Sequence, residues 1–220
     1  ARLYAQQELI TRGKDATDAA WKLASDENKP LYARVAGMYA YAQLAKEGAI
    51  KNLAELATEE DMKAFALRAL SDRKPFLKGV PVEPFLSALK DTSKSVEFAG
   101  IIGLGRLGRP EAAEALLQIP VPASFVAPAK GTEGPHATPN SAIIPAHLAV
   151  KALVALHATD ACVKAIGTEH SALALWALRY MHDMKAVDGL IAAYRQTGDK
   201  DLNAKIVSTQ GQQTDDKELK

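Results

Sequence analysis

A small residue followed by a large apolar residue recurs inside five apolar stretches of this 220-residue chain. The five dipeptides are Ala40-Tyr41, Ala69-Leu70, Gly103-Leu104, Ala152-Leu153 and Ala177-Leu178. An apolar residue stands four positions before the small residue in each stretch, and a spacing of four places both residues on one face of a helix. A short break and a second apolar helical pattern follow most of these stretches. The sequence therefore predicts stacked helical hairpins and no sheet.

The spacing of the repeat predicts the kind of helical array. The intervals between the small residues, by subtraction of their positions, are 29, 34, 49 and 25 residues. Units of the HEAT and armadillo types lie in this range or are somewhat longer. We therefore expect an all-α fold, an α-solenoid of about six HEAT- or armadillo-like hairpins in a right-handed superhelix. The expected domain covers residues 1–207, and residues 208–220 form a polar C-terminal tail.

The charge and the apolar content limit the possible partners. The chain holds 27 Lys and Arg against 26 Asp and Glu, a net charge of +1, so we expect no general attraction for nucleic acid. No uninterrupted apolar run reaches the length of about 18 residues that a membrane span needs. The chain begins with a sequence typical of the middle of a helix. We therefore expect it to be a fragment, or a processed portion, of a longer protein.

The segment Gly103–Gly108 matches G-x-G-x-x-G, the dinucleotide-binding fingerprint. That motif binds pyrophosphate only where a strand precedes it and a helix opens at it. Here the glycines fall at the end of a helical repeat, with Gly103 in the position of the small residue and Gly108 in that of a C-terminal stop. We interpret the motif as a helix-packing feature and expect no bound nucleotide.

The remaining residue types offer no recognisable catalytic or metal-binding pattern. Cys162 is the single cysteine, and it lies on an apolar helical pattern typical of a buried thiol. The five histidines show no zinc spacing, and His147, His157 and His182 fall at helix ends, where capping or packing is the expected role. We therefore predict no catalytic, cofactor-binding or metal-binding residue and no cofactor.

A proline-rich segment over residues 119–145 interrupts the array. Its six prolines exclude a long helix, and loops of this length in compact arrays are often functional. Within it, His136, Thr138 and Asn140 alternate as polar groups in a stretch stiffened by proline, and they form a candidate partner-contact loop. The alternative is a structural loop that folds back and caps the helix expected from Ala146.

Two shorter segments also carry specific expectations. Residues 58–61, Thr-Glu-Glu-Asp, combine a hydroxyl with acidic side chains, which is typical of a helix N-terminus. Residues 72–84 hold three prolines and one glycine, and we expect an extended connector there.

Six stretches together resemble one family region. They are ARLYAQQELITRG, ARVAGMYAYAQL, FALRALSDRK, GLGRLGRPEAAEALL, GPHATPNSAIIPAHLAVKALVAL and DMKAVDGLIAAYR. The set is similar to the HEAT-like portion of large secreted proteins typical of planctomycetes, verrucomicrobia and some bacteroidetes. Those proteins join a sorbosone-dehydrogenase-like β-propeller, a HEAT-like region and a C-terminal c-type cytochrome domain. They are often described as membrane-bound dehydrogenases or haem-binding proteins.

The resemblance implies a non-catalytic scaffold or protein-interaction module, placed in the periplasm or outside the cell. Its partners would be the adjacent domains of the parent chain or another protein, and sugar oxidation and electron transfer would belong to those other domains. One alternative is a stand-alone regulatory module that binds a protein or peptide. Another is a HEAT-like nucleic-acid enzyme of the DNA-glycosylase type, which needs a basic groove that the sequence does not predict.

Overall fold

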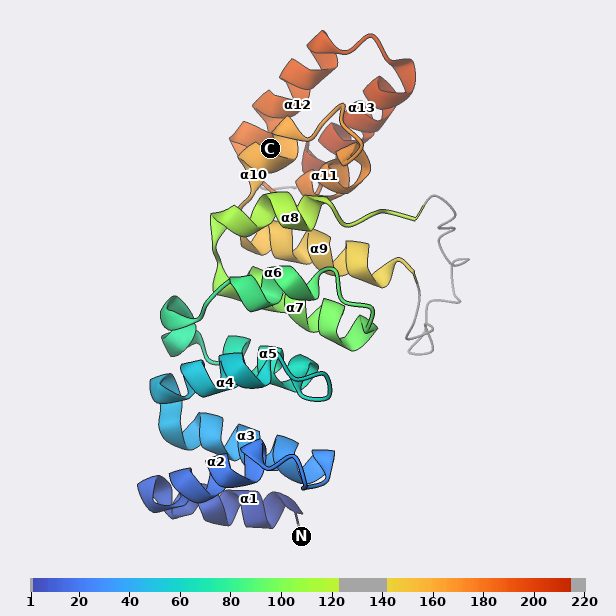
Figure 1. Ribbon diagram of the computed structural model, residues 1–220. Helices are drawn as coiled ribbons and strands as arrows, with labels where there is room; N and C mark the ends of the chain where they lie inside the picture. The colour runs from blue at the N-terminus through green and yellow to red at the C-terminus, as the bar shows by residue number, and fades with distance from the viewer. Residues whose placement is uncertain (1, 123–141, 215–220) are drawn as a thin grey trace, which may run out of the picture. The chain divides into compact units, whose positions relative to one another are not determined.

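The computed structural model describes residues 2–122 and 142–214 (Figure 1). This part of the chain forms 13 α-helices and four short 3₁₀-helices, and it contains no strand. The prediction of an all-α fold is confirmed for these residues. The chain divides into two compact units, Ala1–Leu107 and Gly108–Lys220.

The helices of the first unit pack in consecutive pairs. They are α1 (Arg2–Thr11), α2 (Thr17–Ser25), α3 (Leu31–Ala45), α4 (Ile50–Leu56), α5 (Lys63–Ser71), α6 (Glu83–Ala88) and α7 (Lys94–Leu107). Helix α2 packs with α3, α4 with α5, and α6 with α7. The second helices of the pairs also stack, with α5 between α3 and α7 (Figure 1).

The second unit repeats this contact pattern. Its helices are α8 (Ala113–Leu117), α9 (Ile144–Ala155), α10 (Thr159–Lys164), α11 (Ser171–Leu178), α12 (Met184–Gln196) and α13 (Lys200–Thr214). Helix α8 packs with α9, α10 with α11, and α12 with α13. Helix α11 contacts both α9 and α13, so the second helices again stack on one another.

The small residues of the sequence repeat lie on these second helices. Ala40, Ala69, Gly103, Ala152 and Ala177 fall on α3, α5, α7, α9 and α11, and all five are buried. A small side chain at a contact lets two helix backbones approach closely. The repeat therefore marks a buried position on each second helix, and at Gly103 the neighbour is Phe85 of α6, the first helix of the same pair.

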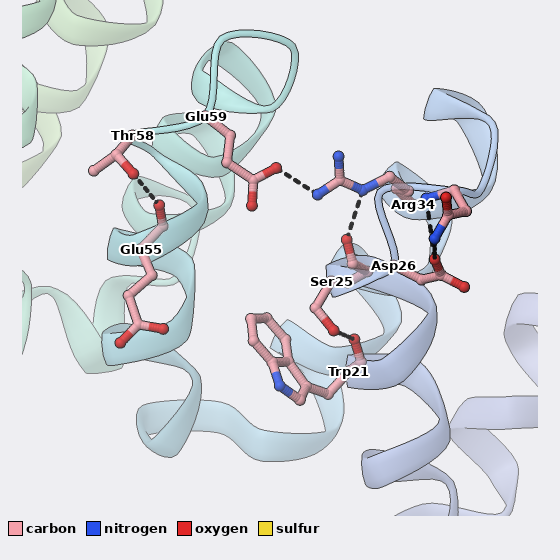
Figure 2. A network of polar contacts seen from close by, with 9 residues as sticks. Trp21, Ser25, Asp26, Arg34, Glu55, Thr58 and Glu59 are labelled. Carbon is pink, nitrogen blue, oxygen red and sulfur yellow. Dashed lines mark hydrogen bonds and ion pairs between the residues drawn. The ribbon is translucent and has the colours of Figure 1, made fainter.

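Arg34 joins the first two helix pairs (Figure 2). It lies in the first turn of α3 and is only 7% exposed. Its Nε donates a hydrogen bond to the Ala24 carbonyl oxygen at the end of α2, at 2.9 Å, and its Nη2 pairs with Glu59 between α4 and α5. A buried guanidinium requires such partners, because an unpaired charge in the interior is strongly unfavourable.

The prediction that residues 58–61 cap a helix is wrong. The Thr58 hydroxyl donates to the Glu55 carbonyl oxygen at 2.8 Å, and α5 begins at Lys63 without a side-chain cap. The Glu59 side chain instead accepts from Arg34.

Lys63 joins the next two pairs in the same manner. It is the first residue of α5, and its Nζ lies 3.2 Å from Oδ2 of Asp91, in the connection between α6 and α7. Hydrogen bonds to Glu60 and Asp91 raise the pKa of Lys63. The hydrogen bond from the Ser93 backbone N–H lowers the pKa of Asp91, and the hydrogen bond from Lys63 lowers it by a smaller amount. In each case a cation in the first turn of a second helix reaches an acid in the following pair.

Three boundaries differ from those expected. Helix α6 begins at Glu83 and α9 at Ile144, each with a proline in its first turn, where the missing N–H would have no helical partner. Residues 74–79 form a 3₁₀-helix within the expected extended connector. Helix α13 continues into the expected tail as far as Thr214, because Thr209 is fully buried on it.

Among the helices of the described residues, none combines the length and the apolar content that a membrane span requires.

Candidate functional site

The stacked second helices of the first unit surround a surface hollow of about 330 Å³. Its walls are Tyr39 from α3, Arg68 from α5, Asp72 directly after α5, and Ile102 and Arg106 from α7. We call this feature the arginine hollow. Each of three consecutive helix pairs contributes at least one side chain to it.

The repeat register explains why these side chains gather. Tyr39, Arg68 and Ile102 each stand immediately before the small residue of their repeat. Asp72 and Arg106 both stand three positions after it, in neighbouring repeats. Because α3, α5 and α7 stack on one another, residues in the same register position line the same hollow.

Positive charge predominates in the arginine hollow. Arg106 Nη1 lies 3.6 Å from Oδ1 of Asp72, and both side chains are exposed. Arg68 makes no side-chain hydrogen bond or salt bridge to another residue that the structure describes, and the same holds for the Tyr39 hydroxyl. Two guanidinium groups therefore face one carboxylate, and hydrogen-bond donors outnumber acceptors.

Tyr39 adds a neutral donor to this surface. Burial raises the pKa of its phenol, the charge of Arg68 acts in the opposite direction, and Asp72 raises it further. The phenol therefore keeps its proton at neutral pH and can donate a hydrogen bond. Sequence reasoning missed this site, although the register position before each small residue was available to find it.

The second unit has a larger groove of about 660 Å³ beside α8 and α10. His157 and His170 line it, together with Glu114, Asp160 and Lys164. His157 has a φ of 51°, in the left-handed region where glycine is favoured. It ends α9 in a Schellman motif, in which the Ala158 N–H donates to the Leu153 carbonyl oxygen at 3.1 Å.

The histidines are distributed rather than clustered. His147 makes an edge-on contact with Trp176, with ring centroids 5.9 Å apart, which confirms the packing role predicted for it. His170 Nε2 lies 3.6 Å from a carboxylate oxygen of the neighbouring Glu169. Within residues 2–122 and 142–214, no group of three or more His, Cys, Asp and Glu side chains could hold a metal ion.

The glycine motif lies inside a helix. Gly103 is buried in α7, and a Cβ added there would overlap the ring of Phe85. Gly108 follows the helix with a φ of 67°, as expected for a C-terminal stop. The packing role predicted for Gly103 is confirmed by this close approach of α7 to Phe85.

The other sequence predictions for individual residues divide into two groups. Cys162 is fully buried, and burial raises the pKa of its thiol to about 12, which confirms the prediction of an inert thiol. His136, Thr138 and Asn140 lie outside the described residues. The partner-contact loop therefore stays a prediction.

No model of a known protein family matches the chain. A search of curated proteins likewise finds no match. The resemblance to the HEAT-like region of secreted propeller–cytochrome proteins thus stays a prediction from the sequence.

Proposed function

We propose that this chain is a non-catalytic protein-interaction scaffold built as a HEAT-like α-solenoid. The observation that carries the proposal is the repeated stacking of second helices within each unit, in one sequence register. In such an array each pair contacts only its neighbours, and the aligned positions make a continuous surface for a partner.

The arginine hollow is the best-defined part of that surface. Its side chains come from three consecutive helix pairs, so a partner lying there contacts α3, α5 and α7 at once. Binding spread over several repeats is typical of scaffolds, whereas catalysis needs a compact set of reacting groups.

The proposed partners follow from the sequence resemblance. They are the adjacent domains of a larger exported dehydrogenase or haem-binding protein, and a stand-alone regulatory module is the alternative. The reading frame around the coding sequence distinguishes the two. Flanking propeller and C-x-x-C-H segments favour the first, and a short frame without them favours the second.

Small-angle X-ray scattering of the whole chain tests the architecture. A compact domain of this length has a radius of gyration of about 17 Å, from the general scaling of domain size. An α-solenoid is longer in one direction, so we expect a clearly larger value. A radius of gyration at the compact value would contradict the solenoid.

Binding measurements test the scaffold role. We expect isothermal titration calorimetry to detect binding between this chain and a separately produced segment encoded next to it. Replacing residues 121–140 with a short glycine-serine link then tests the loop that contains His136, Thr138 and Asn140. Unchanged binding by that variant would remove the loop from the partner surface, and absence of binding by the wild-type chain would contradict the scaffold role.

A further inference from the structure

The arginine hollow holds donors that the described residues leave available. Among the described residues Arg68 has no salt-bridge partner, and Tyr39 lines the same hollow. Arg106 is paired only with Asp72, through exposed side chains at 3.6 Å. An exposed ion pair of this kind contributes about 0–1 kcal/mol, so a better acceptor can replace it.

We propose that the arginine hollow binds the carboxylate of an aspartate or glutamate side chain on a partner protein segment. The inference rests on the proposed scaffold function and names the chemistry of its partner. A guanidinium presents parallel N–H groups that match the two oxygens of a carboxylate, and such charge-assisted pairs are among the stronger hydrogen bonds. Arg68 is the primary donor, and Arg106 and Tyr39 complete the set.

The charge balance of the hollow favours a carboxylate over a phosphate. Two arginines and Asp72 leave one net positive charge. A carboxylate carries one negative charge and matches this balance, whereas a phosphorylated side chain carries nearly two. The Asp72 carboxylate at the rim would repel the additional charge.

The apolar wall indicates what stands beside the acid. Ile102 is 40% exposed and is the apolar side chain at the surface of α7 that lines the hollow. Ala99 is buried and also lines the hollow. A partner segment with an apolar residue next to its acid would cover Ile102 while the carboxylate meets Arg68.

The test uses the full chain and a displayed library of random 12-residue peptides. Peptides are selected on the wild-type chain and then on the double variant Arg68→Gln/Arg106→Gln. Arg195→Gln, an exposed position on α12, is the matched control. We expect the peptides lost on the double variant, but kept on the control, to be enriched in Asp or Glu beside an apolar residue.

Synthetic peptides then measure the effect. We expect one selected peptide to bind the double variant about tenfold more weakly or worse, because charge-assisted hydrogen bonds are removed. Replacing its acid with the corresponding amide should produce a similar loss on the wild-type chain. Arg68→Lys/Arg106→Lys should restore part of the affinity, since lysine keeps the charge but not the planar fork.

Three outcomes would overturn the carboxylate site. They are failure to select any peptide, selected peptides that the double variant binds equally well, and tighter binding of a phosphoserine peptide than of its glutamate counterpart. Circular dichroism of the double variant verifies that it folds as the wild-type chain does. If the neighbouring encoded segment binds the double variant and the wild-type chain equally, this inference fails while the scaffold function stands.

Discussion

The two units join their helix pairs with different chemistry. In the first unit, Arg34 pairs with Glu59 and Lys63 with Asp91. In the second unit, the Thr159 hydroxyl donates to Asp183 at 3.2 Å, and His147 contacts Trp176. The first unit therefore links its pairs through a buried arginine and a half-buried lysine. The second unit uses a hydroxyl–carboxylate hydrogen bond, an aromatic contact and the exposed Lys185–Asp160 ion pair at 3.9 Å.

This difference shows that the repeat sets the packing geometry and leaves the polar links free to vary. The small residues keep one register through both units, while the residues that bridge consecutive pairs change type. A helical array needs close contact between neighbours, and several side-chain chemistries can satisfy the connections around that contact.

The largest effect is expected at the glycines that make close helix contacts. Gly103→Ala places a methyl group against the fully buried ring of Phe85 in the first unit, and we expect a loss of about 3 kcal/mol from overpacking. Gly189→Ala meets the half-buried Val163 in the second unit. Both methyl carbons of Val163 and its Cβ lie within 3.2 Å of the added carbon, so rotation alone cannot relieve the contact. The half-buried side chain can shift outward, and alanine has the better helix propensity, so we expect a smaller loss of about 1 kcal/mol.

Urea unfolding of both glycine variants measures the two losses. Equal losses would show that Phe85 can move as readily as Val163. Saturable binding of a dinucleotide at micromolar concentration would separately contradict the packing role of Gly103.

The next largest losses of stability are expected from removing the side chains that connect consecutive helix pairs. Arg34→Met removes a buried guanidinium and leaves the Ala24 carbonyl oxygen and the Glu59 carboxylate without it, and we expect a loss of about 2 kcal/mol. Thr159→Val removes one hydroxyl, while Asp183 still accepts from the Lys185 N–H at 3.0 Å. We expect a loss of about 1 kcal/mol there. A greater loss for the threonine variant, measured by urea unfolding, would reverse the comparison.

The helix ends should show effects of opposite sign. Gly13 in the first unit and His157 in the second both have positive φ, at 63° and 51°. We expect Gly13→Ala to destabilise and His157→Gly to stabilise the chain, each by about 1 kcal/mol, because only glycine adopts this region without a steric cost. Thermal unfolding checks both variants. A destabilised His157→Gly variant would show that the imidazole makes contacts worth more than the strain.

The smallest effect is expected from the titration of the Lys63–Asp91 link. The pKa of Asp91 is lowered in the folded chain, so its contribution is full above the unfolded pKa of about 3.9 and is lost as the pH falls through the lower folded value. The pKa of Lys63 is raised, so its contribution is lost only as the pH rises through that raised value. Asp91→Asn should therefore flatten both limbs of a plot of unfolding temperature against pH. If the unfolding temperature of this variant depends on pH as that of the wild-type chain does, other titratable groups cause the dependence.

Several features of the fold follow from the sequence alone. The helical period and the five small residues predict the all-α class and mark the buried side of α3, α5, α7, α9 and α11. The position of Gly108 after an apolar stretch predicts a helix end there, and the apolar context of Cys162 predicts that this residue is buried. These features depend on the period of the backbone and on the size of single side chains, which a linear pattern records.

Other features required the tertiary structure. Glu59 has the sequence context of a helix cap and becomes the partner of Arg34, because packing brings the connection between α4 and α5 beside the start of α3. The arginine hollow exists because stacking aligns Arg68 with Arg106 across consecutive pairs. Both depend on which helical turns contact each other between neighbouring helices. These contacts are set by how the side-chain surfaces of whole helices pack, which a local sequence pattern does not specify.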